Sequence, residues 1–451
     1  MVCLPATWAV QNTAAGGIRL RILYATYWTM PGSGGIDTSV KNWRARLEAA
    51  GHTVDTLGHH VEELALHTSD GLFIEEQPGR DIANPFVHLP PSFERHFEIS
   101  RYAFELCCAQ LGMERYDIVH THDVTSTRAM RRILPAGVPL VATLHGSWTV
   151  EAMLNGFTMA GEHLVSYLMR AERAGIESAD HVFVPSMGLR RQLSDMLGVP
   201  PDRMEVLANS VDVQDILRRA GEQTTFPEVP EGSFVLLCPG RLVPEKGHRD
   251  LLEAVALLLR KGRRIHLWIA GKGHLLEKLQ EAAKGLGIAE HVAFLGHRSD
   301  LPALMRRADA VVAPSVQDVL PHTVAEAQVV GAAVVATRIG GIPEMVVHGR
   351  NGLLARARDP YDLSEKIDAL VADERLRTRL ARTAAAFGRR RWRGDREFRR
   401  LLGTYEALRR GLPRTNVADA PTGKVPFDPA VYDRLRATGY AIPDPLFQSV
   451  T

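Results

Sequence analysis

Residues 310–337, AVVAPSVQDVLPHTVAEAQVVGAAVVAT, contain a complete strand–helix–strand unit. The runs 310–313 and 333–337 are apolar on both faces, which is typical of parallel strands buried between two layers of helices. Pro321 suits the first turn of the helix that we predict between them, over 322–330. This stretch therefore predicts an α/β fold with a parallel sheet.

The same alternation of short apolar strands and longer helical patterns extends over most of the chain. The predicted strands are 19–25, 117–121, 139–144, 181–185, 204–208, 234–238, 265–270, 292–295, 310–313 and 333–337. The predicted helices are 36–50, 161–179, 187–197, 248–262, 274–286, 322–330 and 361–386. Such spacing predicts a doubly wound α/β protein.

The alternation pauses once, at 212–233, and the strand pattern restarts at Phe234. The pause predicts a linker between two α/β domains. We expect a leader at 1–17, an N-terminal Rossmann-like domain at 18–215, a linker at 216–233, a C-terminal Rossmann-like domain at 234–387 and an irregular tail at 413–451.

Composition excludes several classes of protein. The 451 residues include 54 Lys and Arg against 52 Asp and Glu, and a net charge of +2 does not favour nucleic acid as the main partner. The four cysteines form neither a disulfide framework nor a zinc-site spacing. No run of about 18 apolar residues is present, and the N-terminus lacks a charged signal-peptide region. We expect a soluble, cytoplasmic protein.

Candidate site residues lie in the loops that follow strands, because ligands of open α/β sheets bind beyond the carboxyl ends of the strands. Gly34 and Gly35 precede a helix whose N-terminus can face a phosphate or a sugar. His145 follows strand 139–144 and can donate to a substrate oxygen or transfer a proton. Arg241 and Lys246 stand before a helix start and suit a diphosphate.

Further candidates come from the next loops. Gly271 and Gly273 allow close backbone approach of a ligand, and Asp318 lies eight residues before Glu326, so that the two carboxylates can hold separate hydroxyl groups. Between these carboxylates the helix start offers backbone groups to a ligand. These groups belong to Val319, Leu320, Pro321, His322 and Thr323.

Each signal is weak alone, because a tight turn, a surface histidine or solvated loop charges would produce the same residues. The pair His120 and His122 has the H-x-H spacing of metal ligands, but no third ligand of suitable spacing follows. The sequence therefore predicts no metal site.

In combination, the motifs resemble retaining glycosyltransferase family 4, which has the GT-B fold. Residues 314–354 resemble its signature, P-S, E-x7-E, a V-V-A-T-x-x-G-G-I-P-E segment and G-x-x-G-L-L. The G-R-L…K-G and A-G-x-G elements resemble residues 240–247 and 270–273. The resemblance implies two Rossmann-like domains facing across a cleft, with a return helix at 388–412 that crosses back to the N-terminal domain.

The resemblance also implies transfer of a hexose or N-acetylhexosamine from a UDP- or GDP-sugar, with retention and without a metal or other cofactor. Arg241 and Lys246 would hold the diphosphate, and Glu326 would bind the ribose. Asp318 and the backbone of 319–323 would bind the donor sugar, with His145 near its anomeric carbon. Two further glycines, Gly34 and Gly35, would let the N-terminal loop close on the phosphates and acceptor.

Some features leave alternatives open. Asp318 replaces the usual Glu of the signature, and Ser210 replaces the glycine of the N-G-V-D element. A GT-B epimerase, a disaccharide phosphorylase and a non-catalytic sugar-nucleotide-binding protein are the competing hypotheses. The seven arginines of 389–400 fit a solvated helix face or a surface that docks to an anionic acceptor or to the inner face of a membrane. Neither the acceptor nor the oligomeric state follows from the sequence.

Overall fold

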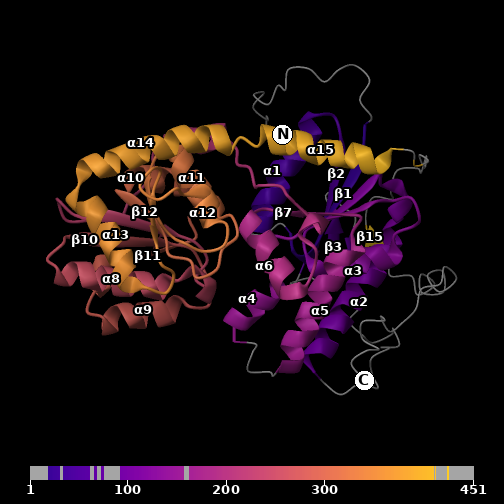
Figure 1. Cartoon of the computed structure of the whole chain (residues 1–451), viewed down its shortest axis with the longest axis horizontal. Coiled ribbons are helices and arrows are strands. Elements are labelled where there is room, and N and C mark those ends of the chain that lie inside the picture. The colour runs from indigo at the N-terminus through magenta and orange to yellow at the C-terminus, as the bar shows by residue number, and fades with distance from the viewer. Residues whose placement is uncertain are drawn as a thin grey trace. The chain divides into compact units, whose positions relative to one another are not determined.

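The structure, a computed structural model, describes residues 19–30, 34–60, 65–68, 73–75, 92–156, 162–410, 412 and 424–425. It divides into two compact units (Figure 1). Unit 1 comprises Met1–Val184, Arg190–Leu207 and Arg396–Thr451, and unit 2 comprises Pro185–Leu189 and Ala208–Asp395. The predicted leader lies outside the described residues, as does the predicted tail except for a two-residue strand.

Unit 1 contains a sheet whose described strands follow the order β15-β4-β3-β2-β1-β5-β6-β7-β8. In the part of the sheet with the order β2-β1-β5-β6-β7-β8, every pair of neighbouring strands is parallel. Strand β3 is antiparallel to β2 and to β4. The strands are β1 Arg21–Thr29, β2 Thr53–His60, β3 Ala65–Thr68, β4 Phe73–Glu75, β5 Ile118–Thr121, β6 Leu140–Thr143, β7 His181–Val184, β8 Met204–Val206 and β15 Lys424–Val425.

The helices of unit 1 separate these strands, as a doubly wound fold requires. They are α1 Gly35–Ala49, α2 Phe93–Cys108, α3 Val124–Ile133, α4 Trp148–Leu154, α5 Glu162–Ser178, α6 Met187–Leu197, whose residues up to Leu189 belong to unit 2, and α15 Asp395–Arg409. Helix α15, yellow in Figure 1, returns the chain to unit 1. Its Phe398, Leu401 and Tyr405 join the buried cluster that contains Ile22 and Tyr24 of β1.

Unit 2 contains a sheet in which all neighbouring described strands run parallel, in the order β11-β10-β9-β12-β13-β14. The strands are β9 Phe234–Pro239, β10 Ile265–Ala270, β11 Val292–Gly296, β12 Ala310–Ala313, β13 Ala333–Thr337 and β14 Leu353–Ala355. The helices are α7 Val213–Ala220, α8 His248–Arg260, α9 Leu276–Gly285, α10 Leu301–Arg307, α11 His322–Val330, α12 Ile342–Met345, α13 Pro360–Ala372 and α14 Glu374–Arg391.

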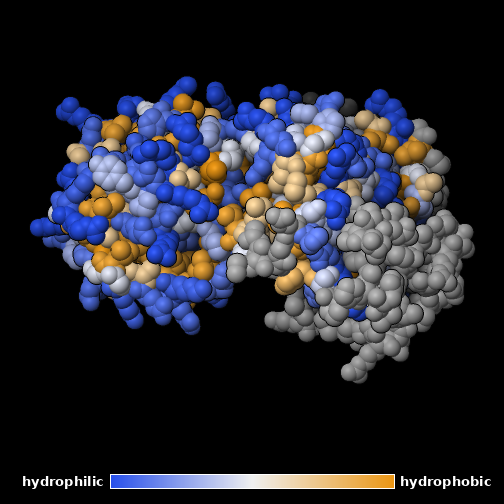
Figure 2. All heavy atoms as spheres, turned by 60° about the horizontal axis from the view of Figure 1, so that its bottom comes forward, coloured by the Kyte–Doolittle hydropathy of each residue, from blue (hydrophilic) through white to orange (hydrophobic). Residues whose placement is uncertain are grey.

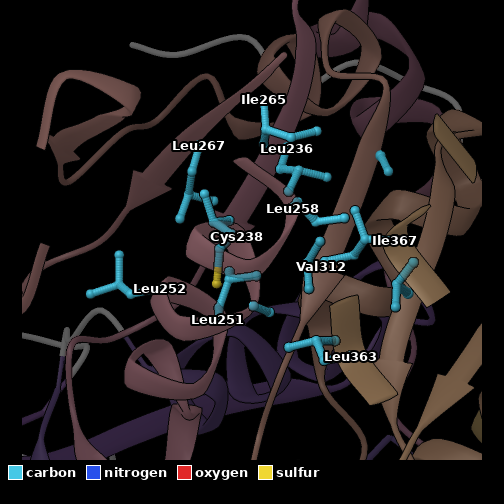
Figure 3. Packing of buried hydrophobic residues seen from close by; sticks show 14 of the residues in the cluster. Leu236, Cys238, Leu251, Leu252, Leu258, Ile265, Leu267, Val312, Leu363 and Ile367 are labelled. Carbon is cyan, nitrogen blue, oxygen red and sulfur yellow. The ribbon is translucent and has the colours of Figure 1, made fainter. Parts of the chain in front are cut away.

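The core of unit 2 explains why its strands are apolar on both faces. Alternate residues such as Leu236 of β9 and Val312 of β12 pack against Leu258 of α8 and Ile367 of α13 (Figure 3). The intervening residues, such as Leu237, are also buried but lie outside that cluster. Helices therefore cover both faces of the sheet, as predicted for a doubly wound fold.

Two boundaries differ from the prediction. The division between the units falls at Leu207 and Ala208 rather than within 216–233, because α7 packs in unit 2. There Arg306 donates to the carbonyl of Ala220 at 3.5 Å. The predicted helix 361–386 is two helices, α13 and α14, because the Asp373 side chain accepts from the amide of Leu376 at 2.9 Å and caps a new helix.

Hydrophilic residues cover most of the described surface in Figure 2. Exposed large hydrophobic side chains are spread over different elements, including Trp28 of β1, Phe93 of α2 and Tyr361 of α13. No helix within the described ranges is long and apolar enough to cross a membrane.

Candidate functional site

Three loops meet at the carboxyl ends of the strands of unit 2. The loop after β9 spans 240–247, the loop after β10 spans 271–275, and the loop after β12 spans 314–321. The amide of Leu242 donates to the carbonyl of Lys272 at 2.9 Å, and the amide of Val316 donates to the carbonyl of Glu245 at 2.9 Å. These bonds join the three loops into one continuous edge, which we call the loop edge of unit 2.

Glycines allow the loops to pack this closely. A Cβ atom at Gly271 would lie 1.8 Å from the carbonyl oxygen of Gly240, and one at Gly273 would lie 2.3 Å from that of Leu242. The missing side chains of Gly271 and Gly273 thus face a neighbouring loop. The structure gives these two glycines a packing role in addition to the ligand contact that their motif implies.

Lys246 and Asp318 form the central charged pair of the loop edge. The Nζ atom of Lys246 lies 2.6 Å from Oδ2 of Asp318, and Ser315 Oγ donates to the same oxygen at 3.0 Å. Asp318 Oδ1 accepts from the amide of Val319 at 3.0 Å. The two side chains are 23% and 12% exposed, so the Lys246 ammonium is held firmly but can still reach a ligand. Ser315 is a site residue that the sequence analysis missed, although it is the serine of the P-S motif.

Arg241 is held less tightly than Lys246. Its guanidinium lies 3.0 Å from Glu245 Oε1, and its side chain is 56% exposed. The other Glu245 oxygen, Oε2, is buried and has no hydrogen-bond partner within the described part of the chain. The loop edge therefore contains two cations that are close in sequence, the partly enclosed Lys246 and the exposed Arg241. Both side chains carry N–H donors that suit phosphate oxygens.

The backbone at the start of α11 corrects part of the sequence prediction. Val319 has donated its amide to Asp318, and Pro321 has no amide hydrogen, so neither offers a free donor. The amides of Leu320 and Thr323 have no acceptor among the described residues. Helix α11 has no side-chain cap at its N-terminus. The unsatisfied amides of this helix start attract an anion or a ligand oxygen.

Glu326 is an ionisable group without a hydrogen-bond partner among the described residues. Its half-buried carboxylate makes no hydrogen bond or ion pair with any described residue, and burial raises its pKa from 4.5 to about 7, while Arg219 lowers it. A raised pKa means that Glu326 stabilises the fold most below pH 4.5, and that this contribution is lost as the pH rises through about 7. A ligand that donates hydrogen bonds to the ionised carboxylate would offset this cost.

In unit 1, three histidines gather at the carboxyl ends of the neighbouring strands β5 and β6. We call His120, His122 and His145 the histidine column. The rings of His120 and His122 stack with centroids 4.6 Å apart, and those of His122 and His145 stack at 5.4 Å. His122 Nδ1 lies 3.1 Å from His145 Nε2. His122 of the H-x-H pair therefore supports His145 by stacking and hydrogen bonding. Among the described residues, no group of three or more His, Cys, Asp and Glu side chains could hold a metal ion.

A buried carboxylate fixes the segment that follows His145. Glu172 of α5 accepts from the amide of Trp148 at 2.8 Å and from Thr149 Oγ1 at 2.7 Å, and burial raises its pKa. These bonds anchor the N-terminus of α4 immediately after His145. No motif in the sequence analysis singled out Glu172, because its partners are backbone and hydroxyl groups that only the fold brings together.

At the start of α1, Gly34 has no steric requirement for glycine among the described residues. Gly34 is the residue before the first turn of α1, and a Cβ atom there would meet nothing within 4 Å. Its carbonyl accepts from the amide of Thr38 at 3.2 Å. Gly35, the first residue of α1, is exposed.

Comparisons with known proteins identify the family. The family described as "Glycosyl transferases group 1" matches residues 222–387, and "Glycosyltransferase Family 4" matches residues 33–215. A D-inositol 3-phosphate glycosyltransferase of Thermomonospora curvata is 30% identical over 83% of this chain and 90% of its own length. The chain belongs to glycosyltransferase family 4.

Solved structures of glycosyltransferases share the two-domain GT-B fold of this family 4 chain. Sucrose-phosphate synthase of Thermosynechococcus elongatus matches with a TM-score of 0.67 and 18% identity, over 86% of this chain and 99% of its own. Anabaena HepE in complex with UDP matches with a TM-score of 0.59 and 20% identity, over 86% of this chain and 100% of its own. The chain is thus a glycosyltransferase with the GT-B fold.

Proposed function

We propose that this glycosyltransferase moves a hexose or N-acetylhexosamine from a UDP- or GDP-sugar to an acceptor hydroxyl, with retention and without a metal. The Lys246–Asp318 pair carries this proposal, because it places a half-enclosed ammonium beside a carboxylate at the loop edge of unit 2. HepE was solved with UDP, which supports a nucleoside diphosphate in a fold of this kind.

The described contacts support one role for each residue. Lys246 and Arg241 bind the diphosphate and stabilise the charge that develops on it as the sugar departs. Asp318 and the amides of Leu320 and Thr323 bind hydroxyls of the donor sugar. Glu326 accepts hydrogen bonds from the ribose, because its carboxylate makes no hydrogen bond with any of the described residues.

The reaction needs no nucleophile from the protein. The acceptor oxygen bonds to the anomeric carbon on the face from which the phosphate leaves, and the carbon–oxygen bond to the phosphate breaks with its electron pair on the phosphate. The acceptor proton passes to a phosphate oxygen. His145 contacts the transferred sugar in this proposal. The relative from Thermomonospora makes an inositol phosphate the first acceptor to test.

We expect turnover with a nucleotide sugar to survive removal of metal. The test incubates the protein with UDP-glucose, UDP-N-acetylglucosamine and GDP-mannose, with and without EDTA, and measures the nucleoside diphosphate released. Equal release under both conditions supports the proposal. Loss of release in EDTA with rescue by manganese would contradict the metal-free mechanism, and donor binding without release would favour a non-catalytic sugar-nucleotide-binding protein.

We expect the affinity for UDP to depend on the ionisation of Glu326. Because its pKa is about 7, the carboxylate gains charge as the pH rises, and the charged form is the better acceptor for ribose hydroxyls. The Kd for UDP should fall about tenfold between about pH 6 and about pH 8. Glu326→Gln should bind more weakly and lack this part of the pH dependence, which calorimetry can measure. An unchanged profile in Glu326→Gln would remove Glu326 from the ribose site.

A further inference from the structure

One ring nitrogen of His122 has no hydrogen-bond partner within the described part of the chain. His122 is 1% exposed, and its Nδ1 atom lies 3.1 Å from His145 Nε2. Its other nitrogen, Nε2, is buried and has no hydrogen-bond partner in the described ranges. Tyr24 packs edge-on to the ring at 4.9 Å between centroids. The two ring nitrogens of His122 therefore have different surroundings, which distinguishes its two neutral tautomers, Nδ1–H and Nε2–H.

His122 is a neutral imidazole at physiological pH. Burial lowers its pKa well below 6.5, and His120 and His145 lower it further. His120 is neutral for the same main reason, and its nitrogens contact Tyr405 Oη and Thr143 Oγ1. The nearest buried carboxyl group in sequence, Asp123, accepts hydrogen bonds from the amides of Tyr27 and Ser126 and from Thr26 Oγ1. A neutral His122 carries one hydrogen, on either Nδ1 or Nε2.

The position of that hydrogen follows from the cost of a buried donor. A hydrogen on Nε2 would leave a buried N–H without an acceptor, and such orphaned donors are rare in folded proteins. A hydrogen on Nδ1 is directed to His145 Nε2 and leaves only a lone pair unsatisfied. The first arrangement would also require His145 to donate from Nε2. The second requires His145 Nε2 to accept.

We propose that His122 is a positioning residue, which donates its Nδ1 hydrogen to His145 Nε2 and thereby holds His145 neutral with its hydrogen on Nδ1. The proposal rests on the proposed function in one respect, namely that His145 contacts the transferred sugar. In this form the Nε2 lone pair of His145 is engaged by His122. His145 does not serve as the base, so the acceptor proton goes to the departing phosphate.

The first test is independent of activity. NMR correlation spectra of nitrogen-labelled imidazoles in the full chain report which ring nitrogen carries hydrogen, and comparison with His122→Asn and His145→Asn identifies the signals. We expect both His122 and His145 as Nδ1–H tautomers near neutral pH. An Nε2–H tautomer or an imidazolium at His145 would overturn the proposal.

A matched pair of variants tests the consequence for turnover. Asn and Asp have nearly the same shape, but an Asn amide can donate from the position of His122 Nδ1, whereas an ionised Asp can only accept. We expect His122→Asn to keep UDP-glucose turnover within a few-fold and His122→Asp to lower it about 100-fold. In His122→Asp the spectrum should show hydrogen on His145 Nε2.

These readouts separate the two proposals. Equal turnover in the Asn and Asp variants, with His145 shown to change its tautomer, would overturn the positioning role. The predicted tautomers in a parent protein that turns over none of the sugar nucleotides would instead overturn the proposed function and leave the hydrogen-bond arrangement established. Unaltered melting temperatures and UDP affinities would show that both variants are folded.

Discussion

Replacing Lys246 by Met should lower kcat/KM for donor turnover by about 100- to 1,000-fold, the usual effect of removing one fixed donor to developing charge. Lys246 meets Asp318 at 2.6 Å and is only 23% exposed, so its ammonium is already placed before a ligand binds. Met keeps the length of the side chain and removes the charge. The variant also leaves Asp318 with only Ser315 Oγ and the Val319 amide as partners.

A second lysine provides the control. Lys261 pairs with Glu365 and lies just after α8 ends, at the opposite edge of the same sheet. Its ammonium also pairs with a carboxylate but lies away from the loop edge, so Lys261→Met should leave turnover within about twofold. Equal turnover in Lys246→Met and the parent protein would show that the diphosphate does not bind at Lys246.

Replacing Arg101 by Leu should destabilise the protein by about 3–5 kcal/mol, because it breaks two buried ion pairs at once and leaves Glu98 with Arg128 and Glu105 with Arg132. Arg101 is 1% exposed and lies 2.9 Å from Glu98 Oε2, and it also pairs with Glu105. Burial by itself raises the pKa of Glu98, but Arg101, Arg128 and Tyr167 together hold it at about 2. Glu98 therefore contributes stability above its ordinary pKa, and this contribution disappears as the pH falls toward 2.

The exposed pair Arg44–Glu48 is a matched control, because it has the same i,i+4 spacing as Arg101–Glu105 but lies at the surface of α1. Arg44→Leu should cost only about 0.3–0.5 kcal/mol. Urea unfolding across acidic pH gives both values. In Arg101→Leu, mild acidification should partly restore stability, because buried Glu98 then gains from protonation. Similar costs for the two variants would contradict the importance of burial.

Five of the six described strands of unit 2 were predicted from the sequence because their burial is simple, whereas β14 was missed. Strands β10, β12 and β13 have the predicted bounds, and so do helices α6 and α11. Every residue of β12 and β13 is buried, so their continuous aliphatic runs clearly indicated buried strands. Family motifs then identified the loops that hold Lys246 and Asp318, although their contact depends on the adjacency of β9 and β12 in the sheet.

Other elements were hidden by polar groups that only the fold can satisfy. Helix α2 was missed because its buried face carries Glu98, Arg101 and Glu105, which interrupt the apolar stripe of an ordinary helix. Strand β2 was missed because polar residues alternate along it, including the buried Asp55, which pairs with Arg21 at 3.0 Å. The role of His122 beside His145 likewise depends on the parallel pairing of β5 and β6.

The anomeric configuration of the product tests the central claim most directly. The protein is incubated with the α-linked nucleotide sugar that it turns over, and proton NMR records the anomeric signal of the first product, formed with the acceptor or with water. We predict an α product that accumulates as the nucleoside diphosphate is released. A β product would contradict front-face transfer at the loop edge of unit 2.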